Sequence, residues 1–212
     1  MRIMVGIPVI YDVDCVRRCL EHIKEADEIL IVDNNSTLDI KKLIQPYNKI
    51  VNDKNIYVNP AWNQLMSYFL DHKEFDTIII LNSDIYLKND VIRKIKTLDL
   101  DGDKIIPLVT GVSAFENVKE LKTSVVTDGV PGVFLCMSRK MVELVYPIPA
   151  EIKLWFGDNW IFQKLRKAGY KMTVFNDLQA MMDWSRSISK LPEATKIIEE
   201  DKVAWSLILK NL

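Results

Sequence analysis

Short apolar runs alternate with longer stretches of helical period from the amino terminus to about residue 110. The runs at 3–7, 28–32 and 77–81 are predicted to be strands, and a weaker strand is predicted at 49–51. Strands that alternate with helices in this way are typical of a sheet whose strands run mostly parallel. The fold class predicted from this part of the chain is therefore α/β.

The stretches between these runs place apolar residues on one helical face. Helices are predicted at 14–24, 38–44, 60–71, 89–97 and 160–168. Asp14 would cap the first helix, and Pro60 would occupy the first turn of the third, where its missing N–H costs nothing. Gly169 would end the last of them, before a strand at 171–175.

The carboxyl-terminal segment is predicted to form an amphipathic helix at 192–209. Its apolar stripe is made by Ile197, Ile198, Ala204, Trp205, Ile208 and Leu209. Its other face is predicted to be acidic, which disfavours anionic membranes, and contains Glu199, Glu200 and Asp201. We therefore divide the chain into a main domain at 1–190 and a helical segment at 191–212. That segment packs on the domain or contacts a second copy in a homodimer.

Composition places the chain among folded globular proteins. Of its 212 residues, 49% are hydrophobic and 27% are charged, with only 7 glycines and 8 prolines. This length fits one sizeable core. The formal net charge of -1 supplies no broad attraction to phosphate backbones or anionic lipids, which disfavours the basic class of nucleic-acid-binding proteins.

Cysteine usage and the amino terminus bear on location. Three cysteines, Cys15, Cys19 and Cys136, are too few and too unevenly placed for a disulfide framework, which favours a reducing compartment. The amino terminus has no signal-peptide pattern, and no apolar stretch approaches the ~20 residues that a membrane-spanning helix needs. We expect a cytoplasmic protein with no integral membrane segment.

Polar residues follow three of the predicted strands. Pro8 closes the first, Asp33 begins a polar cluster after the second, and Asn82-Ser83-Asp84 follows the strand at 77–81. The carboxyl ends of parallel strands meet at one edge of a sheet, where ligands bind, so these residues would face a common crevice. Each aspartate taken alone could be a helix cap, and for Asp33 alone the cap is the more common role.

Two other patterns resemble metal sites and are interpreted otherwise. The Asp-Gly-Asp sequence at 101–103 is first of all a turn signal. Cys15, Cys19 and His22 lie at helical spacing, but they lack a fourth ligand nearby and the usual zinc spacing, so the cysteines are predicted to be core residues. With two histidines in the chain, a histidine-based nucleophilic triad is also poorly supported.

Two segments in the second half of the chain are candidates for a pocket wall. Gly129 and Gly132 would let the backbone approach a ligand closely. Further on, Asp158 stands among three aromatic residues, Trp155, Phe156 and Trp160. The alternative is a buried aromatic cluster in which Asp158 caps the helix that follows.

Six motifs occur together in a recognisable order. They are Val5-Gly6-Ile7-Pro8, Ile31 to Thr37, Asn55 to Asn63, Ile80-Leu81-Asn82-Ser83-Asp84, Gly132-Val133-Phe134 and Asp158 to Tyr170. On these motifs the chain, from about residue 3 to 175, resembles the family 2 glycosyltransferases of the GT-A fold. The resemblance implies one GT-A-like domain with a mostly parallel central sheet. It also implies an inverting glycosyltransferase that moves a sugar from a nucleoside diphosphate to an acceptor hydroxyl.

The resemblance implies roles for single residues as well. Donor binding falls to Pro8, Asp33, Asn35, Asn63, Asn82, Ser83 and Asp84. Asp158 matches the catalytic base. The aromatic residues around it, Trp155, Phe156 and Trp160, are predicted to contact the acceptor.

The triplet Asn82-Ser83-Asp84 stands where the family has its DxD motif. Asp84 would therefore bind a divalent cation, Mn²⁺ or Mg²⁺, that bridges the donor diphosphate. Asn82 replaces the first acid of that motif, and no histidine after His72 can serve as a late metal ligand, so Asp183 is the nearest substitute. These departures support an alternative function, a non-catalytic sugar-nucleotide or glycan-binding domain of the same fold.

Partners follow from this reading. The donor is predicted to be a uridine diphosphate sugar, and the acceptor a glycan, a peptide or a hydroxylated nucleobase in DNA. A sugar nucleotidyltransferase is disfavoured because it needs a glycine-rich basic loop after the first strand, and residues 9–12 offer none.

Overall fold

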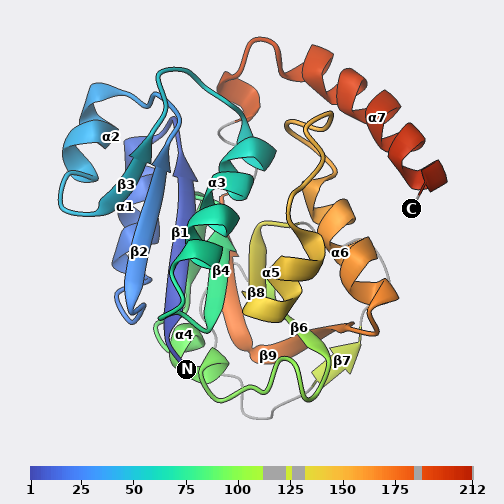
Figure 1. The fold of residues 1–212 in the computed structure, drawn as a ribbon. Coiled ribbons are helices and arrows are strands. Elements are labelled where there is room, and N and C mark those ends of the chain that lie inside the picture. Colours follow the sequence, from blue (N-terminus) through green and yellow to red (C-terminus); the bar gives the residue numbers. More distant parts are fainter. Residues whose placement is uncertain (112–122, 126–131, 184–187, 212) are drawn as a thin grey trace.

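A computed structural model of the chain describes residues 1–111, 123–125, 132–183 and 188–211 (Figure 1). Its larger sheet has the strand order β3-β2-β1-β4-β8. The bounds are β1 (Ile3–Val9), β2 (Glu28–Asp33), β3 (Asn48–Val51), β4 (Thr77–Leu81) and β8 (Phe134–Ser138). Strands β1 to β4 are parallel and β8 pairs antiparallel with β4, which confirms the predicted α/β class and the mostly parallel sheet.

A smaller sheet forms around one long strand, β9. Its members are β5 (Ile85–Leu87), β6 (Ile105–Gly111), β7 (Thr123–Val125) and β9 (Lys171–Met182). The strand predicted at 171–175 is only the first part of β9, which continues because residues 180–182 pair with β5. The same pairing brings Asp183 beside Asp84, whose carbonyl accepts the Asp183 N–H at 3.0 Å.

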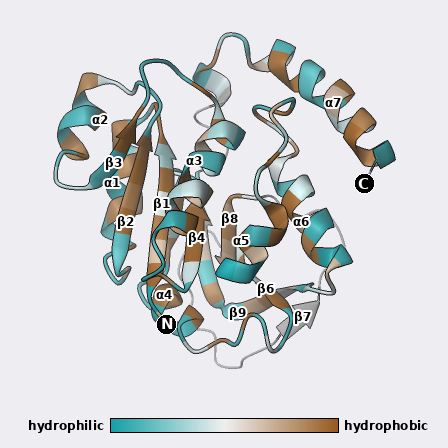
Figure 2. Ribbon diagram, viewed as in Figure 1, coloured by the Kyte–Doolittle hydropathy of each residue, from teal (hydrophilic) through white to brown (hydrophobic). Residues whose placement is uncertain are grey.

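Helices cover both faces of the larger sheet. Figure 1 shows α3 in front of the sheet and α1 behind it, and α3 packs against β1, β2 and β4. The bounds are α1 (Val13–Glu21), α2 (Leu38–Leu43), α3 (Val58–Asp71), α4 (Val91–Ile95), α5 (Arg139–Val145), α6 (Gly157–Lys167), η1 (Ile188–Lys190) and α7 (Ala194–Asn211). Because both faces are covered, every residue of β4 is buried, and Figure 2 shows the central strands as predominantly hydrophobic.

Most helices start one to three residues from the predicted positions, and α1 and α3 illustrate the difference. Asp12, and not Asp14, caps α1, because its backbone turns left-handed (φ 65°) and its carboxylate accepts the N–H of Cys15 at 3.2 Å. Asp14 pairs instead with Arg17 at the surface. Helix α3 starts at Val58, two residues before the predicted start, so Pro60 is its third residue and lies in the first turn, as predicted. Proline is accepted there because the first-turn N–H groups have no partner within the helix.

Helix α7 exists as predicted, but its faces are assigned differently. Asp201, expected on the acidic surface, has an exposed fraction of 0% and lies on the buried face with Ile197 and Trp205. Leu209, expected in the apolar stripe, is exposed instead. The reason is the helical period, which places position 201 four residues from both buried neighbours. The segment packs on the main domain, and a homodimer contact through it stays a prediction.

The two patterns that resembled metal sites have structural roles. Cys15 and Cys19 are buried in the core, as predicted, and residues 101–103 form a turn. Within the described ranges, no three His, Cys, Asp or Glu residues are grouped so that they could hold a metal ion. The same ranges contain no helix with both the length and the apolar character to cross a bilayer.

Candidate active site

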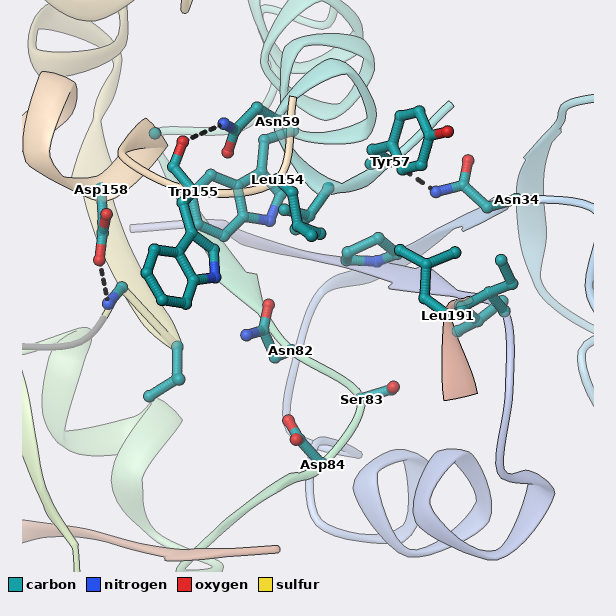
Figure 3. Close-up of a pocket in the computed structure, with 18 of the residues that line it drawn as sticks. Asn34, Tyr57, Asn59, Asn82, Ser83, Asp84, Leu154, Trp155, Asp158 and Leu191 are labelled. Carbon is teal, nitrogen blue, oxygen red and sulfur yellow. Dashed lines mark hydrogen bonds between the residues drawn. The ribbon is translucent and has the colours of Figure 1, made fainter. Parts of the chain in front are cut away.

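A cavity of about 420 Å³ lies at the carboxyl ends of β1, β2 and β4 (Figure 3). Pro8 from β1, Asn34 after β2, and Asn82, Ser83 and Asp84 after β4 all line it. This volume falls in the range of roughly 300–1,000 Å³ that is usual for small-molecule sites. The predicted crevice at this edge of the sheet is therefore present, and it is large enough for a ligand.

The turn at 82–84 is fixed through its backbone. The Asn82 N–H donates to the Val133 carbonyl at 3.1 Å, and the Asn82 carbonyl accepts the Ile85 N–H at 3.2 Å. On its other side the Asp84 carbonyl accepts the N–H of Asp183, the residue directly after β9. Because the main chain carries these bonds, the side chains of Asn82, Ser83 and Asp84 are directed to the cavity wall (Figure 3).

Asp158 approaches the cavity from the first turn of α6. Its Oδ2 accepts the Gly132 N–H at 2.8 Å, and its Oδ1 accepts the N–H of Asn159 at 2.8 Å. A Cβ on residue 132 would lie 2.2 Å from the Cβ of Asp158, so only glycine allows this approach. Gly129, the other glycine of interest, lies outside the described residues. The N-cap position of α6 is Phe156, which makes no side-chain cap bond, and Asp158 is the second residue of the helix. The alternative role of Asp158 as the helix cap is therefore not observed, and its carboxylate faces the cavity.

The loop that leads to Asp158, residues 153–157, is held from two sides. Asn59 of α3 donates its side-chain amide to the Trp155 carbonyl at 2.8 Å and its N–H to the Lys153 carbonyl at 2.9 Å. Asp201 of α7 accepts the N–H groups of Lys153, Leu154 and Trp155 at 2.9, 2.7 and 2.7 Å. The terminal helix therefore shapes the wall that carries Leu154 and Trp155.

Comparison with solved structures finds this fold in glycosyltransferases. S. aureus TarS 1-349 in complex with UDP-GlcNAc aligns with a TM-score of 0.64 and 14% identity over 96% of this chain and 66% of that chain. GalNAc-T7 with UDP, GalNAc and Mn²⁺ aligns with a TM-score of 0.60 and 11% identity over 85% of this chain and 43% of that chain. The protein A197 from STIV aligns with a TM-score of 0.53 and 15% identity, over 85% of this chain and 84% of that chain. At these identities the likeness establishes the GT-A fold.

The sequence profile of glycosyl transferase family 2 matches residues 4–149, more than half of the chain. The chain belongs to this family. No protein of curated function matches it in sequence. It spans 60% to 66% of the TarS 1-349 structures that it matches, and Asp158 lies beyond the matched residues 4–149.

Three predicted donor-binding residues of this family 2 domain lie outside the cavity lining. Asp33 is 2% exposed, and its carboxylate accepts the N–H of Ser36 at 2.7 Å, so it closes its own turn and the next residue, Asn34, lines the cavity. Asn35 points to the surface, where it accepts a bond from Lys41. Asn63 uses both ends of its amide on the backbone of Ile148, at 2.8 and 2.9 Å.

Of the three predicted acceptor-binding aromatic residues, only Trp155 lines the cavity. Phe156 stacks on Trp205 of α7, with ring centroids 5.7 Å apart. Trp160 donates its indole N–H to the Val145 carbonyl at 2.7 Å. Both side chains therefore have packing roles in α6 and α7 and do not line the cavity, and contact of the aromatic group with the acceptor stays a prediction.

Several lining residues were not singled out from the sequence. They are Asn34, Asn55, Tyr57, Asn59, Trp62 and Leu191. The asparagines lie within two of the motifs, so the motifs located the region and not the side chain. Tyr57 has φ 69° and ψ 179°, a conformation that is costly for any residue but glycine and that concentrates at functional sites. Leu191 reaches the cavity through tertiary structure alone.

Residues 188–193, which we call the strap, border the cavity through Leu191. Lys190 pairs with Asp12 at 3.1 Å, and the Tyr57 hydroxyl donates to Glu193 at 3.2 Å. Between these contacts Leu191 turns into the cavity (Figure 3). The strap thus joins the two helix starts at Asp12 and Tyr57.

The charge of the lining is one-sided. Its charged side chains within the described residues are two carboxylates, Asp84 and Asp158, and no lysine, arginine or histidine is among them. Asp183, the second predicted metal ligand, does not line the cavity, because Arg18 and the Tyr86 hydroxyl each donate to its Oδ2 at 2.7 Å. Burial, and then hydrogen bonds to Cys15 and Asp183, raise the pKa of Tyr86, which keeps its hydroxyl protonated as a donor.

These residues fit a cation that arrives with its ligand. Mg²⁺ is commonly held by one or two carboxylates together with substrate phosphates, and Asp84 supplies one carboxylate at the cavity wall. A preformed cage would need more ligands than the described part of the chain gathers here. Asn82 stands where the DxD motif has its first acid, and this replacement is consistent with a site that offers fewer carboxylate ligands to the cation.

Proposed function

We propose that this family 2 domain is an inverting glycosyltransferase that transfers a sugar from a uridine diphosphate donor to an acceptor hydroxyl. The observation that carries the proposal is that Asp84 and Asp158, from different elements, line one cavity at the carboxyl ends of parallel strands (Figure 3). TarS with UDP-GlcNAc and GalNAc-T7 with UDP share the fold and support a nucleotide sugar as the donor.

The donor enters with a divalent cation. Its diphosphate is anionic and the described lining holds two carboxylates and no cationic side chain, so the nucleotide needs a positive partner. Asp84 would hold this ion, with Mn²⁺ or Mg²⁺ as the hard cation that suits a carboxylate and phosphate oxygens. When bound, the ion stabilises the negative charge that develops on the departing diphosphate.

Asp158 acts as the general base. It takes the proton from the acceptor hydroxyl as that oxygen attacks the anomeric carbon, and the bond from this carbon to the diphosphate oxygen breaks on the opposite side. The configuration inverts, and the proton ends on the carboxylate. The Gly132 N–H holds Oδ2 of Asp158 and leaves its orientation fixed during the transfer.

The acceptor meets the exposed indole of Trp155. This side chain is 40% exposed at the cavity wall, and an aromatic face of this kind binds a sugar ring or a nucleobase by stacking. A glycan, a peptide carrying a hydroxyl, and a hydroxylated nucleobase in DNA are the acceptor classes we propose to test. The net charge of -1 favours the first two. All three cysteines are buried thiols rather than disulfides, which fits the proposed cytoplasmic location.

The proposal is tested by calorimetry with UDP, with and without Mn²⁺, followed by mass spectrometry of pooled acceptors incubated with several UDP-sugars. We expect Mn²⁺-dependent binding and a mass gain of one sugar on one acceptor class. Binding with neither transfer nor donor hydrolysis would favour the non-catalytic sugar-nucleotide-binding domain. The Asp183 carboxylate, which is engaged by Arg18 rather than turned to the cavity, is the observation that keeps this second function under test.

A further inference from the structure

Two buried polar atoms at the cavity have no hydrogen-bond partner. They are the side-chain carbonyl oxygen Oδ1 of Asn59 and the indole nitrogen Nε1 of Trp62. Asn59 is 1% exposed and Trp62 is 4% exposed, and both residues line the cavity. The other buried side-chain atoms without a partner in the described residues belong to residues that do not line it. An unsatisfied buried polar atom costs about 1–3 kcal/mol, so these two call for a ligand.

The orientation of the Asn59 amide is set by the loop at 153–157. Its Nδ2 donates to the Trp155 carbonyl at 2.8 Å, so its Oδ1 is directed elsewhere (Figure 3). A Cβ on residue 157 would lie 2.1 Å from this oxygen, so glycine at 157 leaves room for it. The amide therefore presents an acceptor at a fixed place beside the start of α6.

The two atoms are complementary in hydrogen-bond type. The indole N–H of Trp62 can only donate, and Oδ1 of Asn59 can only accept. They lie three residues apart in α3, on neighbouring turns of one helix face. A ligand that satisfies both must accept one hydrogen bond and donate another, which is what hydroxyl groups on a sugar ring do.

Their position points to the sugar end of the donor. Asn59 contacts the loop that leads directly to Asp158, where the anomeric carbon must lie for transfer. Asn34 lies in the other part of the cavity, after β2, and is held by the Tyr57 carbonyl at 3.3 Å. We propose that Asn59 Oδ1 and Trp62 Nε1 form a subsite for hydroxyl groups of the transferred hexose, an inference that rests on the proposed function.

Access to the subsite involves a small movement of the wall. Each of the two atoms exposes less than 1 Å² in the ligand-free chain. Trp155 lines the same wall, is 40% exposed and is joined to Asn59 through its backbone, so its side chain is free to shift. UDP without a sugar has no group to place there, and the subsite then responds only to sugar nucleotides.

A direct test follows the indole N–H groups by two-dimensional ¹H–¹⁵N NMR of the whole chain. The chain has 5 tryptophans, and the signal missing in Trp62→Phe identifies Trp62. With Mg²⁺ present, we expect UDP-glucose or UDP-GlcNAc to shift the Trp62 signal, and UDP alone to leave it in place. UDP binding without any sugar-dependent shift of Trp62 would overturn the subsite alone. Failure of both UDP and sugar nucleotides to bind would refute the proposed function as well.

Calorimetry supplies the second arm. Trp62→Phe keeps an aromatic ring and removes the N–H, so it should leave the affinity for UDP unchanged and lower the additional affinity due to the sugar by about 5- to 150-fold. Trp160→Phe is the matched control, because it makes the same exchange of an indole for a phenyl ring at a residue whose N–H bonds to the Val145 carbonyl, away from the cavity lining. An equal loss for UDP and UDP-sugar in Trp62→Phe, or the same loss in the control, would contradict the assignment.

Discussion

The two walls of the cavity are built by different kinds of contact. On the wall formed by residues 3–57 and 77–87, several side chains bond to residues close to them in sequence: Asp12 to Cys15, Asp33 to Ser36 and Asn55 to Tyr57. On the opposite wall the partners are far apart in sequence. Gly132 meets Asp158 across 26 positions, Asp201 reaches Lys153 across 48, and Asn59 reaches Trp155 across 96.

In the proposed function the first wall holds the donor nucleotide, and the second wall carries the base and directs the transfer. The first wall is a set of turns after parallel strands, in which local side-chain bonds are combined with long-range backbone bonds, as at the turn 82–84, to Val133 and Asp183. The second wall is positioned only when α3, α6 and α7 have packed together. We therefore expect variants of the second wall to show the larger effects, on rate and on stability, and variants of the first wall to act mainly on nucleotide binding.

The largest effect is expected at Asp158. Asp158→Asn keeps the size of the side chain and an oxygen for the Gly132 N–H, but it removes the base, so the transfer rate should fall by about 10²- to 10⁴-fold. Donor affinity, measured by calorimetry, should stay near that of the unchanged chain. Asp14→Asn, at an exposed site on α1, is the control. A variant that transferred sugar at full rate would move the base to another residue.

Asp201→Asn tests whether the terminal helix builds the second wall. The amide retains one acceptor oxygen for three backbone N–H groups, and a buried N–H without a partner costs about 1–3 kcal/mol, so unfolding free energy should fall by roughly 3 kcal/mol. Urea unfolding followed by circular dichroism measures the loss. Glu200→Gln, exposed on the same helix, should change stability by less than about 0.5 kcal/mol. Equal stability of the two variants would mean that α7 is dispensable for this wall.

Asp84→Asn tests the first wall. Loss of the carboxylate should lower metal-dependent UDP affinity by at least about 10- to 100-fold, the usual cost of disturbing even an outer partner of a metal site. Metal-free UDP binding should not weaken, because a like charge beside the diphosphate has been removed. Asp183→Asn separates the two predicted ligands, since the pairing of Asp183 with Arg18 predicts a smaller loss of metal dependence. An equal loss in both variants would restore Asp183 as a second ligand.

The contrast between the walls also explains what the sequence could predict. The strands, their parallel order and the turn at Asn82-Ser83-Asp84 follow from apolar runs and from polar residues at their ends, which are local signals. The sequence predicted Asp33 as a lining residue, one position before Asn34, which lines the cavity. A polar cluster after a strand does not indicate that Asp33 is the side chain that closes the turn. The motifs thus located the donor wall, and the structure selected the side chains within it.

Roles in the second wall required tertiary contacts. Asp201 stands in an acidic run at the sequence level, yet three backbone N–H groups from residues 153–155 make it a buried residue. Phe156 and Trp160 look like a pocket wall beside Asp158, and their partners Trp205 and Val145 assign them to packing. No spacing rule connects positions separated by 15 to 96 residues, so these assignments could come only from the fold.

The smallest effect is expected at the strap, which contacts Asp12 and Tyr57 of the first wall. Lys190 is 47% exposed and its pair with Asp12 is solvent-screened, so Lys190→Met should cost about 0.2–1 kcal/mol of stability. Partial burial alone would raise the pKa of Asp12, but hydrogen bonds from Lys190 and from the Cys15 N–H outweigh it and lower the pKa below its ordinary value of 3.8.

A carboxylate with a lowered pKa stabilises the folded state above the pKa of the unfolded chain, and this contribution disappears as the pH falls through the folded value. The difference in stability between the unchanged chain and Lys190→Met should therefore be constant near neutral pH and shrink below about pH 4. Urea titrations at several pH values measure it. Lys190 bonds to Asp12 at the start of α1, and the next residue, Leu191, turns into the cavity. The variant should therefore also accelerate nucleotide release, even though its effect on the free energy of unfolding is small. Unchanged release rates would show that the strap is held by Leu191 and by the Tyr57–Glu193 contact instead.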